Sequence, residues 1–306
     1  MKILLAKPRG FCAGVERAVR SVERALKRCG PPVYVLNHIV HNHTVVQTLE
    51  DQGAVFVHDL ANVPQGATLL FSAHGVGPER WIEARARDLH VIDATCPLVE
   101  KVHREARRFA EQDYAIVLIG KAGHDEVTGA TGWAPEHIQV VFTEEDVEHL
   151  DLSADARVAY ITQTTLSVDD CARVIEALRR RFPDIVAPPS DDICYATQNR
   201  QRAVRLLAVE ADLVLVVGDE ASANSTRLAE ICRAAGRESH LIGSAAAIEP
   251  AWLDGVDTVL VTSGASAPEA LVKGVVEYLE RLEPCTVDER EVVHEDVHFA
   301  LPKEIG

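Results

Sequence analysis

The feature that most restricts the fold of this sequence is a regular alternation of short apolar runs with longer helical patterns. The apolar runs are rich in β-branched residues, and a polar or glycine-bearing turn follows each of them. Most are apolar at every position, which is typical of strands that helices cover on both faces. The strand candidates are residues 2–6, 33–36, 68–72, 115–119, 158–161, 213–217 and 258–262. This rhythm predicts an α/β fold with mostly parallel sheets.

Between the strand candidates, apolar residues recur at spacings of three and four, as they do on one face of an α-helix. The helix candidates are residues 14–28, 98–112, 168–181, 199–211, 225–235 and 268–281. No long linker rich in Gly, Ser or Pro separates them, so we expect any domains to meet at compact joints. A chain of 306 residues is long enough for about two ordinary domains or three small ones.

Composition and charge exclude several classes of protein. The chain is 47% hydrophobic and 25% charged, as in globular proteins, and its formal net charge of −16 argues against nucleic-acid binding, which needs clustered Lys and Arg. No apolar run approaches the roughly 20 residues of a membrane span. The first residues, MKILLAKP, become polar too quickly for a signal peptide, so we expect a cytoplasmic protein without membrane contact.

Small polar residues and histidines follow several strand candidates where the strands end. They occur at residues 71–75, 119–124, 217–222 and 262–266. In open α/β sheets, ligands bind beyond the carboxyl ends of the strands. We therefore expect these segments to line one cleft.

Seven cysteines in a chain without a secretion signal favour metal binding or catalysis over disulfides. Cys12, Cys96 and Cys194 each open a long helical segment, where the helix dipole favours the thiolate that metals bind. The alternative is that all three are small buried hydrophobic residues, because their wide spacing matches no local CxxC signature. Three thiolates would leave a fourth metal position open, as catalytic sites require. The remaining cysteines, Cys29, Cys171, Cys232 and Cys285, lie elsewhere and are expected to be ordinary.

Eight dispersed motifs, in order along nearly the whole chain, resemble those of one enzyme family. They are residues 8–15 (PRGFCAGV), 38–42 (HIVHN), 72–76 (SAHGV), 93–97 (DATCP), 123–126 (GHDE), 162–167 (TQTTLS), 192–197 (DICYAT) and 264–268 (GASAP). The chain resembles the LytB/IspH family of 4-hydroxy-3-methylbut-2-enyl diphosphate reductases. That family performs the last step of the methylerythritol phosphate route to isoprenoids. The resemblance implies reduction of the hydroxylated diphosphate to isopentenyl diphosphate and dimethylallyl diphosphate.

The resemblance also implies a fold, a cofactor and a set of site residues. The fold is a trefoil of three pseudo-threefold-related α/β units, which we place at residues 1–95, 96–192 and 193–281, with a tail at 282–306 that closes over the site. The cofactor is one [4Fe–4S] cluster on Cys12, Cys96 and Cys194, with one iron open to substrate. Substrate-binding residues are His41, His74, His124, Thr164, Ser222, Ala223, Asn224 and Ser266, and catalytic residues are Glu126, His124 and Thr164. The implied electron donor is a ferredoxin or a flavodoxin.

One departure from the family pattern lies in the diphosphate loop, which commonly reads Ser-Ser-Asn and here reads Ser222-Ala223-Asn224. Position 223 keeps its backbone amide but lacks a hydroxyl. Loss of one neutral hydrogen bond typically costs about 0.5–1.5 kcal/mol, which weakens binding without abolishing it. We expect activity to survive.

The chemistry explains why these residue types would be used. Reductive removal of an allylic hydroxyl needs two electrons, two protons and a Lewis acid, and Glu126 is a candidate proton donor with Thr164 as relay. Taken alone, Glu126 would be a solvated loop carboxylate and His124 a loop histidine. The diphosphate would meet hydroxyls, histidines and helix-start amides, because no GxxxxGK[ST] loop is present; simple helix capping explains the same Ser and Asn residues equally well.

Two other readings stay open from the sequence. An open cluster could catalyse an aconitase-like dehydration without net reduction, or the chain could be a metal-free phosphate-binding module.

An acidic electron donor would need a local basic face on this acidic chain. The candidates for that face are Arg104, Arg107 and Arg108, or residues 179–181.

Overall fold

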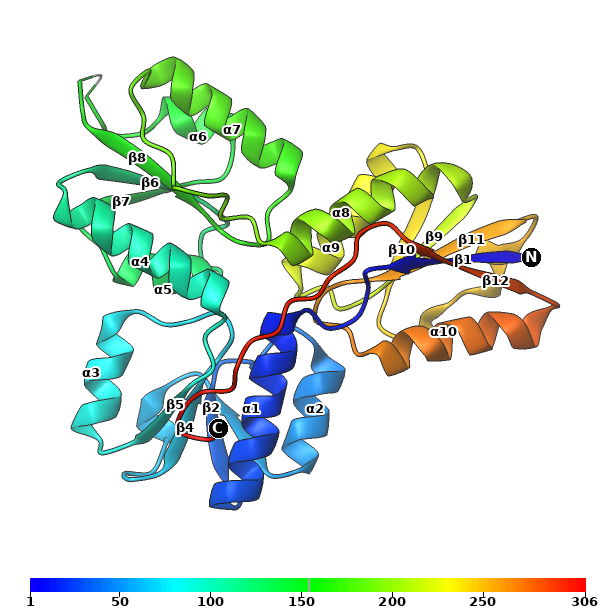
Figure 1. Cartoon of the computed structure of the whole chain (residues 1–306), viewed down its shortest axis with the longest axis horizontal. Helices are drawn as coiled ribbons and strands as arrows, with labels where there is room; N and C mark the ends of the chain where they lie inside the picture. Colours follow the sequence, from blue (N-terminus) through cyan, green and yellow to red (C-terminus); the bar gives the residue numbers. More distant parts are fainter. Residues whose placement is uncertain (154) are drawn as a thin grey trace. The chain divides into compact units, whose positions relative to one another are not determined.

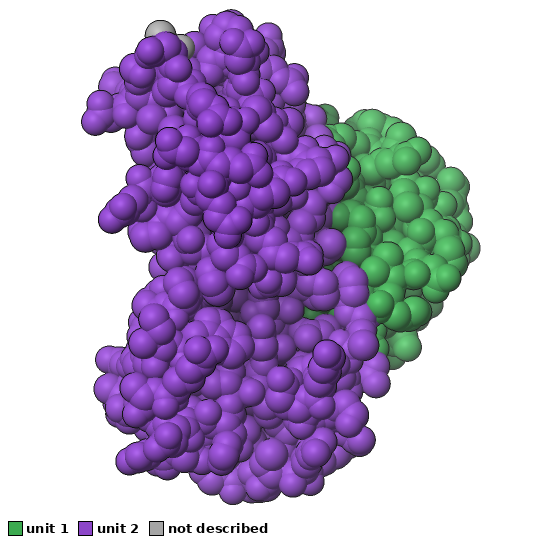
Figure 2. Space-filling view, turned by 60° about the vertical axis from the view of Figure 1, so that its left-hand side comes forward, with its two compact units in different colours: residues 1–16, 41–47, 195–298 green, residues 17–40, 48–194, 299–306 purple. Residues whose placement is uncertain are grey.

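The protein is an α/β protein with parallel sheets, as the sequence predicts. The structure is a computed structural model that describes residues 1–153 and 155–306. Over these residues it contains three sheets, all of them parallel and flanked by helices (Figure 1). The chain forms two compact units (Figure 2). The first comprises Met1–Glu16, His41–Gln47 and Tyr195–His298, and the second comprises Arg17–Val40, Thr48–Cys194 and Phe299–Gly306.

The first unit holds a single five-stranded sheet in the order β10-β9-β11-β1-β12. These strands are β1 (Lys2–Lys7), β9 (Leu213–Val217), β10 (Glu238–Ile242), β11 (Thr258–Ser263) and β12 (Thr286–Glu291). Ile3 and Leu5 pack with the core beneath α10 (Glu269–Leu282), whereas Leu4 and Ala6 pack with α8 (Tyr195–Leu207) and α9 (Ala223–Ala234). Helices on both faces explain why β1 is apolar at consecutive positions.

The second unit holds the other two sheets. The four-stranded sheet has the order β3-β2-β4-β5, from β2 (Val33–Leu36), β3 (Ala54–Val57), β4 (Thr68–Phe71) and β5 (His90–Asp93). The three-stranded sheet has the order β7-β6-β8, from β6 (Ala115–Ile119), β7 (Ile138–Val141) and β8 (Val158–Thr162). Its two faces pack separately, with Ile116 and Leu118 against α4 (Pro97–Glu111) and Val117 and Ile119 against α7 (Val168–Arg181).

The remaining elements are short or connect the sheets. They are α1 (Ala13–Cys29), α2 (His43–Asp51), α3 (Pro78–Ala86), α5 (Asp125–Gly132) and α6 (Glu144–Glu148), with single turns at Leu60–Asn62, Ala208–Glu210, Ala245–Ala247 and Pro250–Leu253. Figure 1 shows α4 and α5 together beside the three-stranded sheet and α3 beside the four-stranded one. The carboxyl ends of β4, β5, β6 and β8 lead into the segments that carry His74, Cys96, His124 and Thr164, respectively.

The three cysteines selected from the sequence lie directly before helices, as predicted. Cys12 precedes α1, Cys96 precedes α4 and Cys194 precedes α8. Ser167 caps the start of α7, where its hydroxyl accepts a hydrogen bond from the Asp170 amide. The start of α8 differs from the prediction: the helix begins four residues earlier, because its polar first turn hides the apolar spacing.

The strand order bears on how the chain is divided. β1 lies between β11 and β12, so the first strand belongs to a sheet otherwise built from residues after 212. The division into 1–95, 96–192, 193–281 and 282–306 stays a prediction.

Among the described residues, no helix combines the length and apolarity that crossing a bilayer requires.

Candidate active site

In the first unit, the loop between β1 and α1 carries Cys12, and backbone contacts fix it. The Cys12 amide donates to the Ala265 carbonyl at 3.2 Å, and the Gly10 amide donates to the Ser263 hydroxyl at 2.7 Å. Gly10 has φ 71°, in the left-handed region that favours glycine. Its carbonyl accepts a hydrogen bond from Arg200 at 2.8 Å. The Cys12 loop is therefore held by the loop after β11 and by α8.

Two side chains of α8 support this loop and were not selected from the sequence. The fully buried Arg200 also donates to the Ala196 carbonyl at 3.0 Å and lies 3.3 Å from the Glu295 carboxylate. The Tyr195 hydroxyl accepts a hydrogen bond from the Ala13 amide at 3.3 Å, and burial raises the pKa of Tyr195, which keeps the hydroxyl neutral. The available signal for Arg200 was its spacing of four and seven residues from Val204 and Leu207, which places it on the buried face of α8.

The first unit also brings together four residues predicted to bind the diphosphate. The Ser266 hydroxyl donates to the His41 carbonyl at 3.1 Å and lies 3.3 Å from the Ser222 hydroxyl. The side-chain oxygen Oδ1 of Asn224 accepts a hydrogen bond from the Ala265 amide at 2.9 Å. Ser222, Asn224 and Ser266 are each at most 6% exposed. Buried hydroxyl and amide groups are thus gathered at one end of the sheet.

The start of α9 forms part of this cluster. Ser222 is the N-cap, its hydroxyl accepts from the Ser225 amide at 3.3 Å, and Ala223 is the first residue of the helix. The capping role expected for such a serine is therefore present. Gly264 approaches this turn so closely that a Cβ there would lie 2.0 Å from the Ser225 hydroxyl. The glycine lets the loop after β11 meet the amide end of α9.

In the second unit, Cys96 is the N-cap of α4, with Pro97 at the first helical position. Its amide donates to the Ala73 carbonyl at 3.0 Å, which ties the thiol to the segment after β4. Arg17 of α1 donates to the Thr95 carbonyl at 3.0 Å and to the Asp93 carbonyl at 3.2 Å. These contacts fix the backbone that leads into the thiol.

Cys194 is held through contacts that also reach α4. Its amide donates to the Thr164 carbonyl at 3.0 Å. Just before it, Asp192 receives a hydrogen bond from Lys101 of α4 at 2.6 Å, and Lys101 also donates to the Ser190 carbonyl at 2.8 Å. The helix that begins after Cys96 is thereby tied to the segment that ends at Cys194.

Glu126, the predicted proton donor, is 2% exposed rather than a solvated loop carboxylate. It accepts hydrogen bonds from the Thr164 amide at 2.5 Å and from the Thr164 hydroxyl at 3.1 Å. Burial raises the pKa of Glu126 to about 7, with a smaller contribution in the same direction from the Asp192 carboxylate. Near neutral pH this carboxyl group is about half protonated, which is the state a proton donor needs.

The two histidines of this unit that are predicted to bind substrate lie close together at the start of α5, the helix that carries Glu126. His124 is the N-cap of α5, and its Nδ1 accepts the Glu126 amide hydrogen at 3.1 Å. Because Nδ1 is an acceptor, a neutral His124 carries its proton on Nε2 and presents a donor there. The His74 ring is 5.8 Å from the His124 ring in an edge-to-face arrangement, and its Nδ1 is 3.9 Å from Asp125. The three predicted catalytic residues, Glu126, His124 and Thr164, are therefore neighbours in the second unit.

The cysteines differ in how well they suit metal binding. Cys12, Cys96 and Cys194 are partly exposed thiols at helix starts. Cys171 and Cys232 are buried, and burial raises their pKa to about 12 and about 11, so both remain thiols. Three partly exposed thiols at helix starts are a donor set that fits an iron–sulfur cluster.

Comparisons with known proteins agree with this picture. The family model described as LytB protein matches residues 3–280. The 4-hydroxy-3-methylbut-2-enyl diphosphate reductases of Mycolicibacterium paratuberculosis and Acidothermus cellulolyticus are 56% and 55% identical, over 99% of this chain and 92% and 90% of their own lengths. A solved E-1-hydroxy-2-methyl-but-2-enyl-4-diphosphate reductase from Plasmodium falciparum is 39% identical with a TM-score of 0.97, covering 99% of this chain and 96% of its own.

Fold and relatives together define the class of protein as an α/β oxidoreductase. Its helix-start thiols and its buried carboxyl group with a raised pKa are consistent with that class. The chain belongs to the LytB family.

Proposed function

We propose that this protein reduces (E)-4-hydroxy-3-methylbut-2-enyl diphosphate to isopentenyl diphosphate and dimethylallyl diphosphate, in the cytoplasm, as the last step of the methylerythritol phosphate route. The C–O bond of the hydroxyl breaks, a C–H bond forms, two electrons and two protons enter, and water leaves. The relatives' names support this substrate. The observation that carries the proposal is the buried Glu126 carboxyl group, held by Thr164, whose carbonyl also binds the Cys194 amide.

The cofactor in this proposal is one [4Fe–4S] cluster held by Cys12 of the first unit and by Cys96 and Cys194 of the second. When bound, the cluster supplies electrons and a Lewis-acidic iron for the leaving hydroxyl. The chain's own contribution is to hold three thiols at helix starts through backbone hydrogen bonds. Lys101 binds Asp192, two residues before Cys194, and Arg200 binds the Gly10 carbonyl, two residues before Cys12.

Glu126 supplies a proton in this proposal. Its raised pKa keeps a proton on the carboxyl group near neutral pH, and the Thr164 hydroxyl beside it can pass that proton toward substrate. His124 holds the Glu126 amide through Nδ1 and so offers its Nε2 hydrogen to the hydroxyl end of the substrate. Burial excludes bulk water from this proton path.

The diphosphate is bound, in this proposal, by His41, Ser222, Asn224 and Ser266 of the first unit together with His74 of the second. The buried side chains of Ser222, Asn224 and Ser266 meet at the start of α9, where backbone amides attract an anion. Ala223 contributes only its amide, so this position binds the diphosphate with one hydroxyl fewer than the Ser-Ser-Asn pattern.

The test is turnover by protein reconstituted anaerobically with iron and sulfide. With dithionite and methyl viologen as reductant, we expect both product diphosphates in chromatography, and Mössbauer spectra with one distinct iron that responds to substrate. Colourless protein after reconstitution would indicate a metal-free phosphate-binding module. Hydration activity without any reduction would indicate an aconitase-like enzyme. Either result would overturn the proposal.

A further inference from the structure

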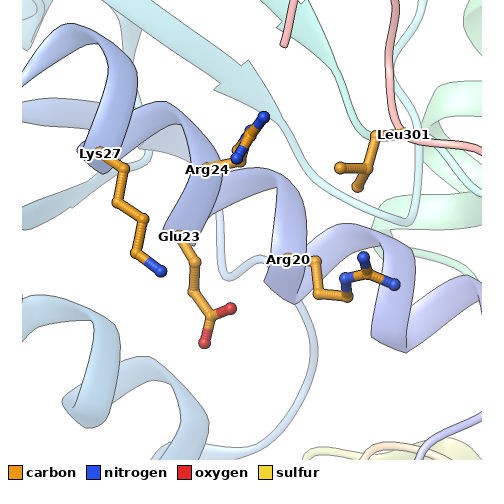
Figure 3. Close-up of a pocket in the computed structure, with 5 residues that line it drawn as sticks. All are labelled: Arg20, Glu23, Arg24, Lys27 and Leu301. Atoms are coloured by element: carbon orange, nitrogen blue, oxygen red, sulfur yellow. The ribbon is translucent and has the colours of Figure 1, made fainter. Parts of the chain in front are cut away.

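A groove of about 320 Å³ lies along α1 in the second unit. Arg20, Glu23, Arg24 and Lys27 line it from successive turns of the helix, and Leu301 of the C-terminal tail completes the lining. Figure 3 shows the Arg24 side chain on the same side of α1 as Leu301, whereas Glu23 and Lys27 point to the other side. Three cations and one carboxylate give the groove a local charge of +2, whereas the whole chain has a formal charge of −16. The groove therefore suits an acidic partner far better than the average surface of this protein does.

One end of the groove connects to a predicted cluster ligand. Arg17, one helical turn before Arg20, donates to the Ala300 carbonyl of the tail at 2.8 Å and to the Thr95 carbonyl at 3.0 Å. Thr95 directly precedes Cys96, and the Arg17 guanidinium is near enough to attract a thiolate at Cys96. Arg17 thus links the wall of the groove to the backbone of a predicted ligand.

The tail forms the opposite wall and is itself tied to α1. Arg24 donates to the Ile305 carbonyl at 3.4 Å, and Ile305 is buried. With the Arg17 contact, the tail is attached to the helix at two places. The groove is therefore a formed feature of the second unit, with a charged wall and an apolar side chain opposite it.

The basic clusters expected from the sequence to dock a donor are largely engaged within the protein. Arg107 pairs with Glu100 at 3.2 Å and lies 4.4 Å above the Trp133 ring. Arg180 pairs with Glu176 at 3.3 Å, and Arg181 donates to backbone carbonyls. These contacts partly neutralise the charges of the two clusters.

We propose that the α1 groove docks a small acidic one-electron redox protein that reduces this enzyme. Carboxylates of the partner contact Arg20, Arg24 and Lys27, and Leu301 adds an apolar contact. This orientation brings the partner's redox group toward the backbone at Cys96. The inference rests on the proposed function, because that reaction needs two electrons from outside the chain.

The test compares two double variants of the reconstituted enzyme that change the net charge equally. R20E/K27E reverses two groove cations, and the control R85E/R202E reverses two exposed arginines outside the groove. A purified acidic ferredoxin is the reductant, and turnover with dithionite and methyl viologen gives each variant's reference rate. Binding of oxidised ferredoxin is also measured by calorimetry.

For R20E/K27E we expect the KM for ferredoxin to rise about tenfold with kcat nearly unchanged, and the affinity measured by calorimetry to fall by a similar factor. The reason is that charged residues at the rim of an interface mainly affect the rate at which the two partners associate. The control should stay close to the wild type in both measurements. Unchanged KM and affinity in R20E/K27E, or an equal change in the control, would overturn the docking site. Absence of turnover with methyl viologen in the wild type would instead overturn the proposed function, while the calorimetry would still decide on the groove.

Discussion

Replacing Glu126 by Gln should remove a pH dependence from the stability of this protein. The folded state raises the pKa of this carboxyl group from 4.5 to about 7, mainly through burial. The folded protein therefore binds more protons than the unfolded chain between these values, and Glu126 makes the fold less stable as the pH rises. The full difference corresponds to about 3.4 kcal/mol, of which about 2.5 kcal/mol falls between pH 5 and pH 8.

Glutamine suits this test because it keeps the shape of the site. Its carbonyl oxygen can accept the Thr164 amide hydrogen, and its NH₂ group can donate to the Thr164 hydroxyl, so the two contacts of Glu126 have counterparts. Only the titrating proton is lost. A change in stability should therefore come from ionisation rather than from repacking.

The assay is urea unfolding of metal-free protein, kept anaerobic, at pH 5 and at pH 8. Relative to E126Q, the wild type should lose about 2.5 kcal/mol of unfolding free energy between the two pH values. The exposed Glu111 at the end of α4 provides the control, and E111Q should follow the wild type. If E126Q shows the same pH dependence as the wild type, Glu126 does not titrate near neutrality in the folded protein and the reasoning fails.

Three further results are expected. The kcat of the reconstituted enzyme should fall as the pH rises through about 7, because ionised Glu126 has no proton to give, and E126Q should lower kcat by about 10²–10⁴-fold; a flat kcat profile would contradict this role. K101M should lower the free energy of unfolding in urea by about 3 kcal/mol, because it leaves the fully buried Asp192 carboxylate without its cation. The control R80M breaks an exposed ion pair and should lower it by less than about 1 kcal/mol. Equal losses in the two variants would refute the argument. A223S should lower the substrate KM by about 2–10-fold by adding one hydrogen bond to the diphosphate, and an unchanged KM would show that position 223 does not contact it.

Much of the fold was predictable wherever a strand is buried on both faces. All five residues of β9 are fully buried, so their apolar run predicted the bounds of this strand correctly. β12 reads TVDERE and lies at the edge of its sheet with mostly exposed side chains. Backbone hydrogen bonds to β1 form this strand, and they leave no trace in the hydropathy pattern.

The residue types of the site were predictable from the sequence, but the contacts that hold these residues in place were not. The placement of Cys12, Cys96 and Cys194 before helices was visible locally, because a helix start is a property of neighbouring residues. The burial of Glu126 was not visible, since its partner Thr164 lies 38 residues away in the sequence. Such contacts depend on how strands are ordered in the sheets, which the sequence pattern leaves open.

The position of β1 between β11 and β12 has a consequence for how the protein is made. On the ribosome, residues 2–7 emerge long before their strand partners at 258–263 and 286–291. Pairing across so long a stretch of chain is slow. The Cys12 loop also waits for Ala265 and Arg200, the partners that shape it. We therefore expect this thiol to reach its final geometry only after the chain has been made beyond Ala265, and a cluster bound as proposed would be loaded after that point.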